Sequence, residues 1–263
     1  MKKSTLDLAS KYYDLVYAQK EDINFYVKMV SECKGPVLEA GCGTGRILTA
    51  IASLGYEITG LDLSKNRLDL CHFKIEQLEN RFKKKVDIYN GNMVNFKLNK
   101  KFKTVLIPFR GIQFITNPEE QLQALKCFAK HLQNRGFLIL DAFNPDINKL
   151  TGKSIFKGRK TLYNCLEGEK LAVVEKIKSM CYIKQLITVE ENYIVTAPGR
   201  ISGCYTHTYT MRYLFRYEIE YMLRLAGFTI NNIFSDFHGT SWGNDDAENI
   251  VIVAQKNNKT ITR

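Results

Sequence analysis

The chain has 263 residues, 45% of them hydrophobic, which suffices to bury the core of one domain or of one domain with an insertion. No apolar run reaches the roughly 18 residues of a membrane-spanning helix, and the acid at Asp7 comes too early for a signal-peptide core. Seven cysteines, an odd number without a C-x-x-C pair, argue for reduced thiols in a cytoplasm and against zinc or another metal. A net charge of +11 keeps nucleic acid among the partners to consider, and we expect no membrane partner.

The first 34 residues are predicted to be helical. Apolar side chains recur at helical spacing over residues 6–17 and 23–30, and the two runs divide near residues 20–22. The first run contains Tyr13-Asp14-Leu15-Val16-Tyr17. Taken alone, either tyrosine is explained equally well by packing of an amphipathic helix and by contact with a ligand.

Residues 36–64 contain an apolar strand, a glycine loop, a helix that begins near residues 44–46, a second strand and an acid. Gly41, Gly43 and Gly45 permit positive φ angles and lack Cβ atoms, so a flat ligand can lie against the backbone. The amides at the start of the helix carry a partial positive charge. Asp62 follows the second strand, where a carboxylate can accept two ribose hydroxyls. These features together predict a nucleoside site.

The glycine spacing distinguishes between nucleoside cofactors. A dinucleotide site needs G-x-G-x-x-G, but here the third glycine comes one residue early and Arg46 takes the place of the NAD-type glycine. This spacing disfavours an NAD-dependent oxidoreductase. The run Glu39-Ala40-Gly41-Cys42-Gly43-Thr44-Gly45-Arg46, followed by Asp62, resembles motifs I and II of the class I S-adenosylmethionine-dependent methyltransferases.

This resemblance implies an α/β fold with a Rossmann-like, seven-stranded, mostly parallel sheet, with S-adenosylmethionine as cofactor and S-adenosylhomocysteine as product. It implies that the glycines cradle the cofactor, that Arg46 meets its methionine carboxylate and that Asp62 binds its ribose. The tyrosines of the first run would cover the cofactor and border the substrate, Tyr17 on the substrate side. The residues assigned to the cofactor are Tyr13, Glu39, Gly41, Gly43, Gly45, Arg46, Asp62, Leu63, Asn92, Met93, Pro108 and Phe109.

Between residues 64 and 145 the pattern predicts a helix over 64–79, strands over 85–89, 103–109 and 137–143, and a helix opening at Pro118. The resembled family commonly has G-D-M after the third strand, where this chain has Gly91-Asn92-Met93; the Asn92 oxygen can still accept a hydrogen bond from the adenine amino group. Residues 108–113 would line the methyl-transfer region, with Arg110 and Gln113 as candidate substrate residues. Many relatives have a histidine here, but this chain reads Gln113-Phe114-Ile115.

Residues 154–213 are rich in β-forming residues and turns, and they predict three or four antiparallel strands inserted as a lid. On the last strand Tyr205, His207, Tyr209, Met211 and Tyr213 alternate onto one face. That face is equally consistent with an acceptor pocket, a homodimer interface and simple packing. The predicted organisation is a helical cap (1–34), a cofactor-binding core (35–150), the inserted antiparallel β lid (151–213) and a helix and strands that complete the sheet (214–263).

The predicted function is in-line transfer of a methyl group to a nitrogen, oxygen or carbon of a small-molecule acceptor. The methyl carbon of a sulfonium is already activated, so the protein mainly aligns the nucleophile; a hydroxyl or carbon acid also needs a general base. Of the four histidines, His72 and His131 are expected at the surface of core helices, which leaves His207 and His238 as candidate bases. Two alternatives stay open: an RNA methyltransferase, not favoured because the basic run over residues 81–103 lacks interleaved aromatics, and a non-catalytic S-adenosylmethionine-binding regulator.

Overall fold

The computed structural model describes residues 12–18, 21–146, 150, 159–165, 168–198, 200–243 and 247–258. Residues 1–11 and 19–20, included in the predicted helical cap, lie outside the described residues. The chain divides into two compact units. We call residues 19–144 with 214–263 the core unit, and residues 1–18 with 145–213 the lid unit. The predicted cap, residues 1–34, is therefore shared between them.

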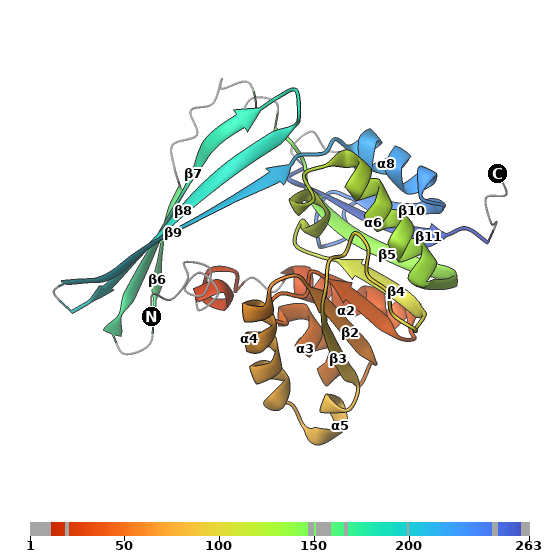
Figure 1. Ribbon diagram of the computed structural model, residues 1–263, viewed down its shortest axis with the longest axis horizontal. Coiled ribbons are helices and arrows are strands. Elements are labelled where there is room, and N and C mark those ends of the chain that lie inside the picture. Colours follow the sequence, from red (N-terminus) through yellow and green to blue (C-terminus); the bar gives the residue numbers. More distant parts are fainter. Residues whose placement is uncertain are drawn as a thin grey trace. The chain divides into compact units, whose positions relative to one another are not determined.

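The core unit is built on a seven-stranded sheet with the order β10-β11-β5-β4-β1-β2-β3 (Figure 1). The strands are β1 (Val37–Ala40), β2 (Ile58–Asp62), β3 (Val86–Asn90), β4 (Phe102–Ile107), β5 (Leu132–Phe143), β10 (Phe228–Phe234) and β11 (Asn249–Lys256). The first five are parallel neighbours, whereas β11 runs antiparallel to both β5 and β10. This arrangement confirms the predicted class I methyltransferase fold with its antiparallel last strand.

Helices cover both faces of this sheet. One face packs against α2 (Glu21–Cys33), α3 (Arg46–Ser53) and α4 (Lys65–Glu76), and the other against α6 (Pro118–His131) and α8 (Arg216–Leu225). Successive strand residues point to opposite faces. Val37 therefore packs in the hydrophobic cluster on the side of α2, α3 and α4, and Leu38 packs in the cluster on the side of α6 and α8. Because both faces are covered, every residue of β1 and β2 is buried. The remaining short elements are α5 (Asn80–Lys83) and the 3₁₀ helix η1 (Gly111–Phe114).

Three expectations for the core unit need correction. The strand predicted over 137–143 begins earlier, at Leu132. The predicted helix over 64–79 ends at Glu76 and is followed by α5. His131, expected at the surface, is buried. Its Nε2 accepts a hydrogen bond from the Leu98 backbone N–H (3.1 Å), its Nδ1 therefore donates to the Cys127 carbonyl (2.9 Å), and its ring stacks on Phe96. The chain segment before β4 covers this end of α6, which the helical pattern alone does not reveal. His72 is exposed, as predicted.

The lid unit contains a four-stranded antiparallel sheet with the order β6-β7-β8-β9 (Figure 1). Its strands are β6 (Arg159–Asn164), β7 (Lys170–Cys181), β8 (Leu186–Ala197) and β9 (Arg200–Arg212). The predicted insertion and the alternation along β9 are confirmed, since Tyr205, His207 and Tyr209 are less exposed than the residues between them. The helical residues 12–16 pack on this sheet, where Tyr12 joins a cluster with Val173 and Tyr193.

None of the helices formed by the described residues is both long and apolar enough to cross a membrane.

Candidate active site

The loop between β1 and α3 has the backbone that its glycines predict. The φ angles of Gly41, Gly43 and Gly45 are 79°, 54° and 79°, all in the left-handed region. A Cβ atom built on Gly43 meets no atom within 4 Å, whereas one built on Gly45 would lie 2.5 Å from the Cys71 Sγ atom. Gly43 therefore leaves space beside the backbone for a ligand, and Gly45 allows the loop to pack against α4.

The side chain of Asp62, the last residue of β2, bonds both to the glycine loop and to the segment that follows β2. Its Oδ2 atom accepts a hydrogen bond from the Gly43 N–H (2.9 Å), and its Oδ1 atom accepts one from the Ser64 N–H (2.8 Å). Each carboxylate oxygen retains a second lone pair, so Asp62 can also accept hydroxyl hydrogen bonds. The Asn90 amide holds the Asp62 and Leu63 carbonyls (3.0 and 2.9 Å), and the Leu63 side chain is 71% exposed beside them.

Glu39 lies within β1, the strand that pairs with β2 and so lies beside the strand of Asp62. Its side chain is 2% exposed, and its Oε2 atom has no hydrogen-bond partner among the described residues. Burial raises the pKa of this carboxyl well above its usual range; Asp62 and Asp22 raise it further, and Arg46 opposes them. A buried acceptor without a partner costs about 1–3 kcal/mol. Glu39 is therefore suited to a ligand group that donates a hydrogen bond or carries a positive charge.

Arg46, the first residue of α3, is held by an acid that no motif in the sequence marks as a site residue. Its Nη1 and Nη2 atoms donate to the two carboxylate oxygens of Asp22 (2.9 and 2.5 Å), and its guanidinium lies 5.7 Å from the Phe109 ring centroid. Asp22 is in the first turn of α2 and is largely buried. This bidentate pairing fixes the direction of the Arg46 guanidinium.

Asn92 and Met93 follow β3 at the same edge of the sheet. The Asn92 Oδ1 atom accepts a hydrogen bond from the Val94 N–H (2.9 Å), and the side chain is exposed. Its oxygen keeps one lone pair and its amide keeps both N–H groups. The Met93 methyl carbon lies 3.4 Å from a Cβ atom built on Gly41. The structure thus brings Met93 next to the glycine loop.

The residues after β4 differ in exposure. Pro108 is buried, Phe109 is partly buried and Arg110 is exposed. The Gln113 side chain is fully buried; its Oε1 atom accepts a hydrogen bond from the Phe143 N–H (2.9 Å), and its Nε2 atom has no partner among the described residues. Gln113 therefore joins η1 to the end of β5, and its predicted contact with a substrate stays a prediction.

The two tyrosines and one of the two candidate bases lie in the lid unit. The ring centroids of Tyr13 and Tyr17 are 4.8 Å apart, and the Tyr17 hydroxyl donates to the Glu191 carboxylate (2.8 Å). Burial raises the pKa of Tyr17, and the Glu191 charge raises it further, so the hydroxyl stays protonated. His207 lies opposite Glu191 in the register of β8 and β9 and is partly buried.

His238, the second candidate base, belongs to the core unit. It lies in the loop after β10 and its side chain is 68% exposed, with Nε2 3.9 Å from the Glu21 carboxylate. The predicted role of each histidine as a base stays a prediction. Within the described ranges, no three His, Cys, Asp or Glu side chains are grouped as metal ligands would be.

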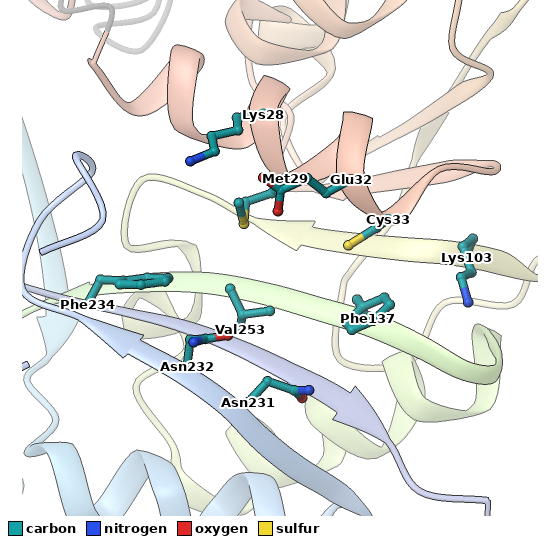
Figure 2. A pocket seen from close by; sticks show the side chains of 10 residues that line it. All are labelled: Lys28, Met29, Glu32, Cys33, Lys103, Phe137, Asn231, Asn232, Phe234 and Val253. Carbon is teal, nitrogen blue, oxygen red and sulfur yellow. The ribbon is translucent and has the colours of Figure 1, made fainter. Parts of the chain in front are cut away.

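A separate pocket of about 580 Å³ lies between α2 and the strands β4, β5, β10 and β11. Figure 2 shows Met29 and Cys33 of α2 on one side and Phe137 and Val253 on the strands on the other. Burial, reinforced by Glu32, raises the pKa of the Cys33 thiol to about 11, so the thiol is protonated at neutral pH. The pocket contains none of the residues assigned to the cofactor, so it is distinct from the glycine-loop site.

Comparison with known proteins identifies the domain that contains the glycine loop. Residues 37–136 match a family model described as a methyltransferase domain. The chain is similar to the putative methyltransferase YqeM of Bacillus subtilis, with 23% identity over 87% of this chain and 86% of that protein. It is also similar to a dTDP-3-amino-3,4,6-trideoxy-α-D-glucopyranose N,N-dimethyltransferase of Streptomyces venezuelae, with 26% identity over 49% of this chain and 54% of that protein.

The fold is similar to that of a solved structure with bound S-adenosylmethionine. CalS10, an amino pentose methyltransferase from Micromonospora echinaspora, aligns with a TM-score of 0.71 and 19% identity over 93% of this chain and 96% of that one. The cofactor is S-adenosylmethionine, and two features fit a ligand with a nucleoside and an ammonium group: the open space at Gly43 and the Glu39 Oε2 atom, which lacks a hydrogen-bond partner in the described part of the chain. Residues 37–136 thus carry a methyltransferase domain, and the chain is an S-adenosylmethionine-dependent methyltransferase with the class I fold.

Proposed function

We propose that the acceptor atom is an amine nitrogen. The observation that carries this proposal is Gln113, which occupies the place where many relatives have a histidine. Its side chain is buried and hydrogen-bonded to the Phe143 N–H, and an amide does not take up a proton at neutral pH. An amine becomes a nucleophile once it has lost its proton, whereas a hydroxyl needs a base as it reacts. Two similar proteins, by their names, methylate amino sugars, which supports the same choice.

In this proposal each site residue binds a different part of the cofactor. Glu39 receives the ammonium group, Asp62 accepts the ribose hydroxyls, and Arg46, oriented by Asp22, meets the carboxylate. Asn92 and Met93 border the adenine, and Pro108 and Phe109 border the reacting end. The sulfonium supplies a methyl group that is already activated, so the protein contributes alignment and exclusion of water.

Calorimetric titration of the purified protein with S-adenosylmethionine, S-adenosylhomocysteine and NAD tests this arrangement. We expect the first two to bind and NAD not to bind. Asp62→Ala should abolish binding, whereas Asp69→Ala, which removes an exposed acid of α4, should leave it unchanged. Equal losses in both variants, or binding of NAD alone, would overturn the cofactor assignments.

The acceptor atom is tested with matched substrate pairs. Each pair consists of an amine and the alcohol of the same skeleton, starting with dTDP-3-amino-3,6-dideoxyglucose and its 3-hydroxy counterpart. Mass spectrometry measures the gain of one methyl group, and S-adenosylhomocysteine release measures the rate. Turnover of amines only is the expected result, and turnover of alcohols only would refute the proposal.

The two remaining alternatives are tested in the same preparations. Lysines of the basic run over residues 81–103 donate to backbone carbonyls, among them Lys85 to Gly55 (2.6 Å) and Lys103 to Arg135 (3.2 Å), which supports a structural role for these charges. A salt-dependent gel shift with total RNA, followed by methylation of that RNA, would favour an RNA substrate instead. Cofactor binding without turnover on any acceptor would favour a non-catalytic regulator.

A further inference from the structure

The chain leaves β4 through a strained turn. Phe109 and Arg110 have φ angles of 54° and 61°. Five non-glycine residues of the described chain have positive φ, and these two are the only adjacent pair among them. A left-handed conformation costs a residue with a side chain about 1–3 kcal/mol and persists only where its surroundings impose it. Neighbouring groups must therefore stabilise this turn.

The neighbouring group is the carboxylate of Asp141. Parallel pairing of β4 with β5 sets Ile107 beside Leu140, so Asp141 lies next to the first residue after β4. Its side chain is 2% exposed, and its Oδ2 atom accepts a hydrogen bond from the Arg110 N–H (2.9 Å). Burial raises the pKa of this carboxyl, and hydrogen bonds from Tyr26 and from the Arg110 and Phe109 backbone oppose that rise. The carboxylate thus binds the turn through its backbone.

Asp141 is itself held in place by α2. The Tyr26 hydroxyl donates to the Asp141 Oδ1 atom (2.6 Å), and the Tyr26 side chain is fully buried. Asp22, four residues earlier and so on the same face of α2, holds Arg46. The Phe109 ring of the strained turn lies 5.7 Å from the Arg46 guanidinium. One helix face thus fixes both Arg46 and the carboxylate that shapes the turn beside it.

We infer that Asp141 is a positioning residue for methyl transfer: its buried carboxylate, oriented by Tyr26, holds the left-handed turn at Phe109 and Arg110 in the shape that the reaction requires. This inference rests on the proposed function, in which residues 108–113 line the methyl-transfer region. Asp141 acts through the turn and touches neither the cofactor nor the acceptor.

A double-mutant cycle tests the contact between Asp141 and the turn. Glycine adopts positive φ without strain. In an Arg110→Gly variant the turn should therefore keep its shape with less stabilisation from Asp141. The shift in urea midpoint caused by Asp141→Asn should then be at least halved in the Arg110→Gly background. Arg135→Gly is the matched control, because Arg135 is also an exposed arginine with positive φ (55°). In that background the Asp141→Asn shift should be unchanged, and equal shifts in both backgrounds would overturn the inference.

Kinetics then separate positioning from folding. With an amine acceptor identified by the substrate pairs, we expect Asp141→Asn to lower kcat at least tenfold. The Kd for S-adenosylhomocysteine and the KM for the acceptor should stay within threefold. An unchanged kcat, or a loss confined to KM or Kd, would overturn the positioning role even if the stability cycle shows coupling. A wild-type protein that turns over no acceptor would instead refute the proposed function, and the two failures are therefore distinguishable.

Discussion

Glu39 allows a sharp test of the electrostatics of the site. Glu39→Gln replaces a buried carboxyl by a neutral group of the same shape. Because burial raises the pKa of Glu39 in the folded protein, the folded chain keeps a proton that the unfolded chain releases near pH 4. The free energy of unfolding of the wild type must therefore fall as pH rises from about 4 to the raised pKa, and it levels off above that value.

The magnitude follows from the proton that the folded wild type keeps. Glutamine leaves an amide oxygen in place of the unpartnered Oε2 atom and cannot ionise, so the cost of a buried acceptor is common to both proteins and only the cost of the bound proton differs. Glu39→Gln should therefore gain stability over the wild type progressively as pH rises from about 4 toward the raised pKa. The difference cannot grow faster than about 1.4 kcal/mol per pH unit, which is the limit for one proton.

Urea unfolding of the wild type and Glu39→Gln across this pH range measures the difference directly. Glu120→Gln is the control, because it makes the same substitution at an exposed position of α6 and should show no such trend. An offset that is constant with pH would reflect altered packing of the glutamine amide. Such a result would refute the raised pKa and, with it, our reason for placing the cofactor's ammonium beside Glu39.

Three further predictions concern single contacts. Gly45→Ala should lower the free energy of unfolding by about 1–3 kcal/mol in denaturant titrations, because the new Cβ atom would lie 2.5 Å from the Cys71 Sγ atom. A Cβ atom on Gly43 meets no atom within 4 Å. Gly43→Ala should therefore lower the free energy of unfolding less than Gly45→Ala does, but should weaken cofactor binding more in calorimetry. Asp22→Asn should cost about 1.5–3 kcal/mol by breaking the bidentate pair with Arg46, and an unchanged urea midpoint would show that the pair is not formed in solution. Tyr17→Phe should cost about 1 kcal/mol, since Glu191 loses one donor but keeps Tyr193 (2.8 Å); a loss above about 3 kcal/mol in thermal unfolding would contradict this.

The predictable part of the fold is encoded in short stretches of sequence. The glycine loop, the start of α3 at Arg46 and the position of Asp62 follow from residue types within one strand-loop-helix-strand unit. The alternation along β9 is equally local, because side chains alternate between a partly buried and an exposed face over residues 204–208. The apolar pattern predicts that β5 starts at residue 137, whereas the strand starts at Leu132, because residues 133–136 are polar or glycine and lack the apolar pattern of a strand.

The partners of the site residues could not be predicted in this way. Arg46 and Asp22 are 24 residues apart in sequence, and Tyr26 and Asp141 are 115 residues apart. Their contacts depend on how α2 packs on the sheet and on the register of β5. Asp141 looks unremarkable in sequence, as a single acid within the apolar run of a strand. An acid in such a run, with both faces of the sheet covered, is nevertheless a useful indication of a buried functional carboxylate.

The same reasoning changes the role of α2. In sequence it is an amphipathic helix that precedes the glycine loop, and its acids at Glu21 and Asp22 suit the first turn of any helix. In the structure, Asp22 and Tyr26 use one helix face to hold Arg46 at the start of α3 and Asp141 at the end of β5. Because these two contacts flank the turn after β4, a rotation of α2 would disturb both at once. The position of α2 on the sheet is thus part of the geometry of the candidate site as well as of the core.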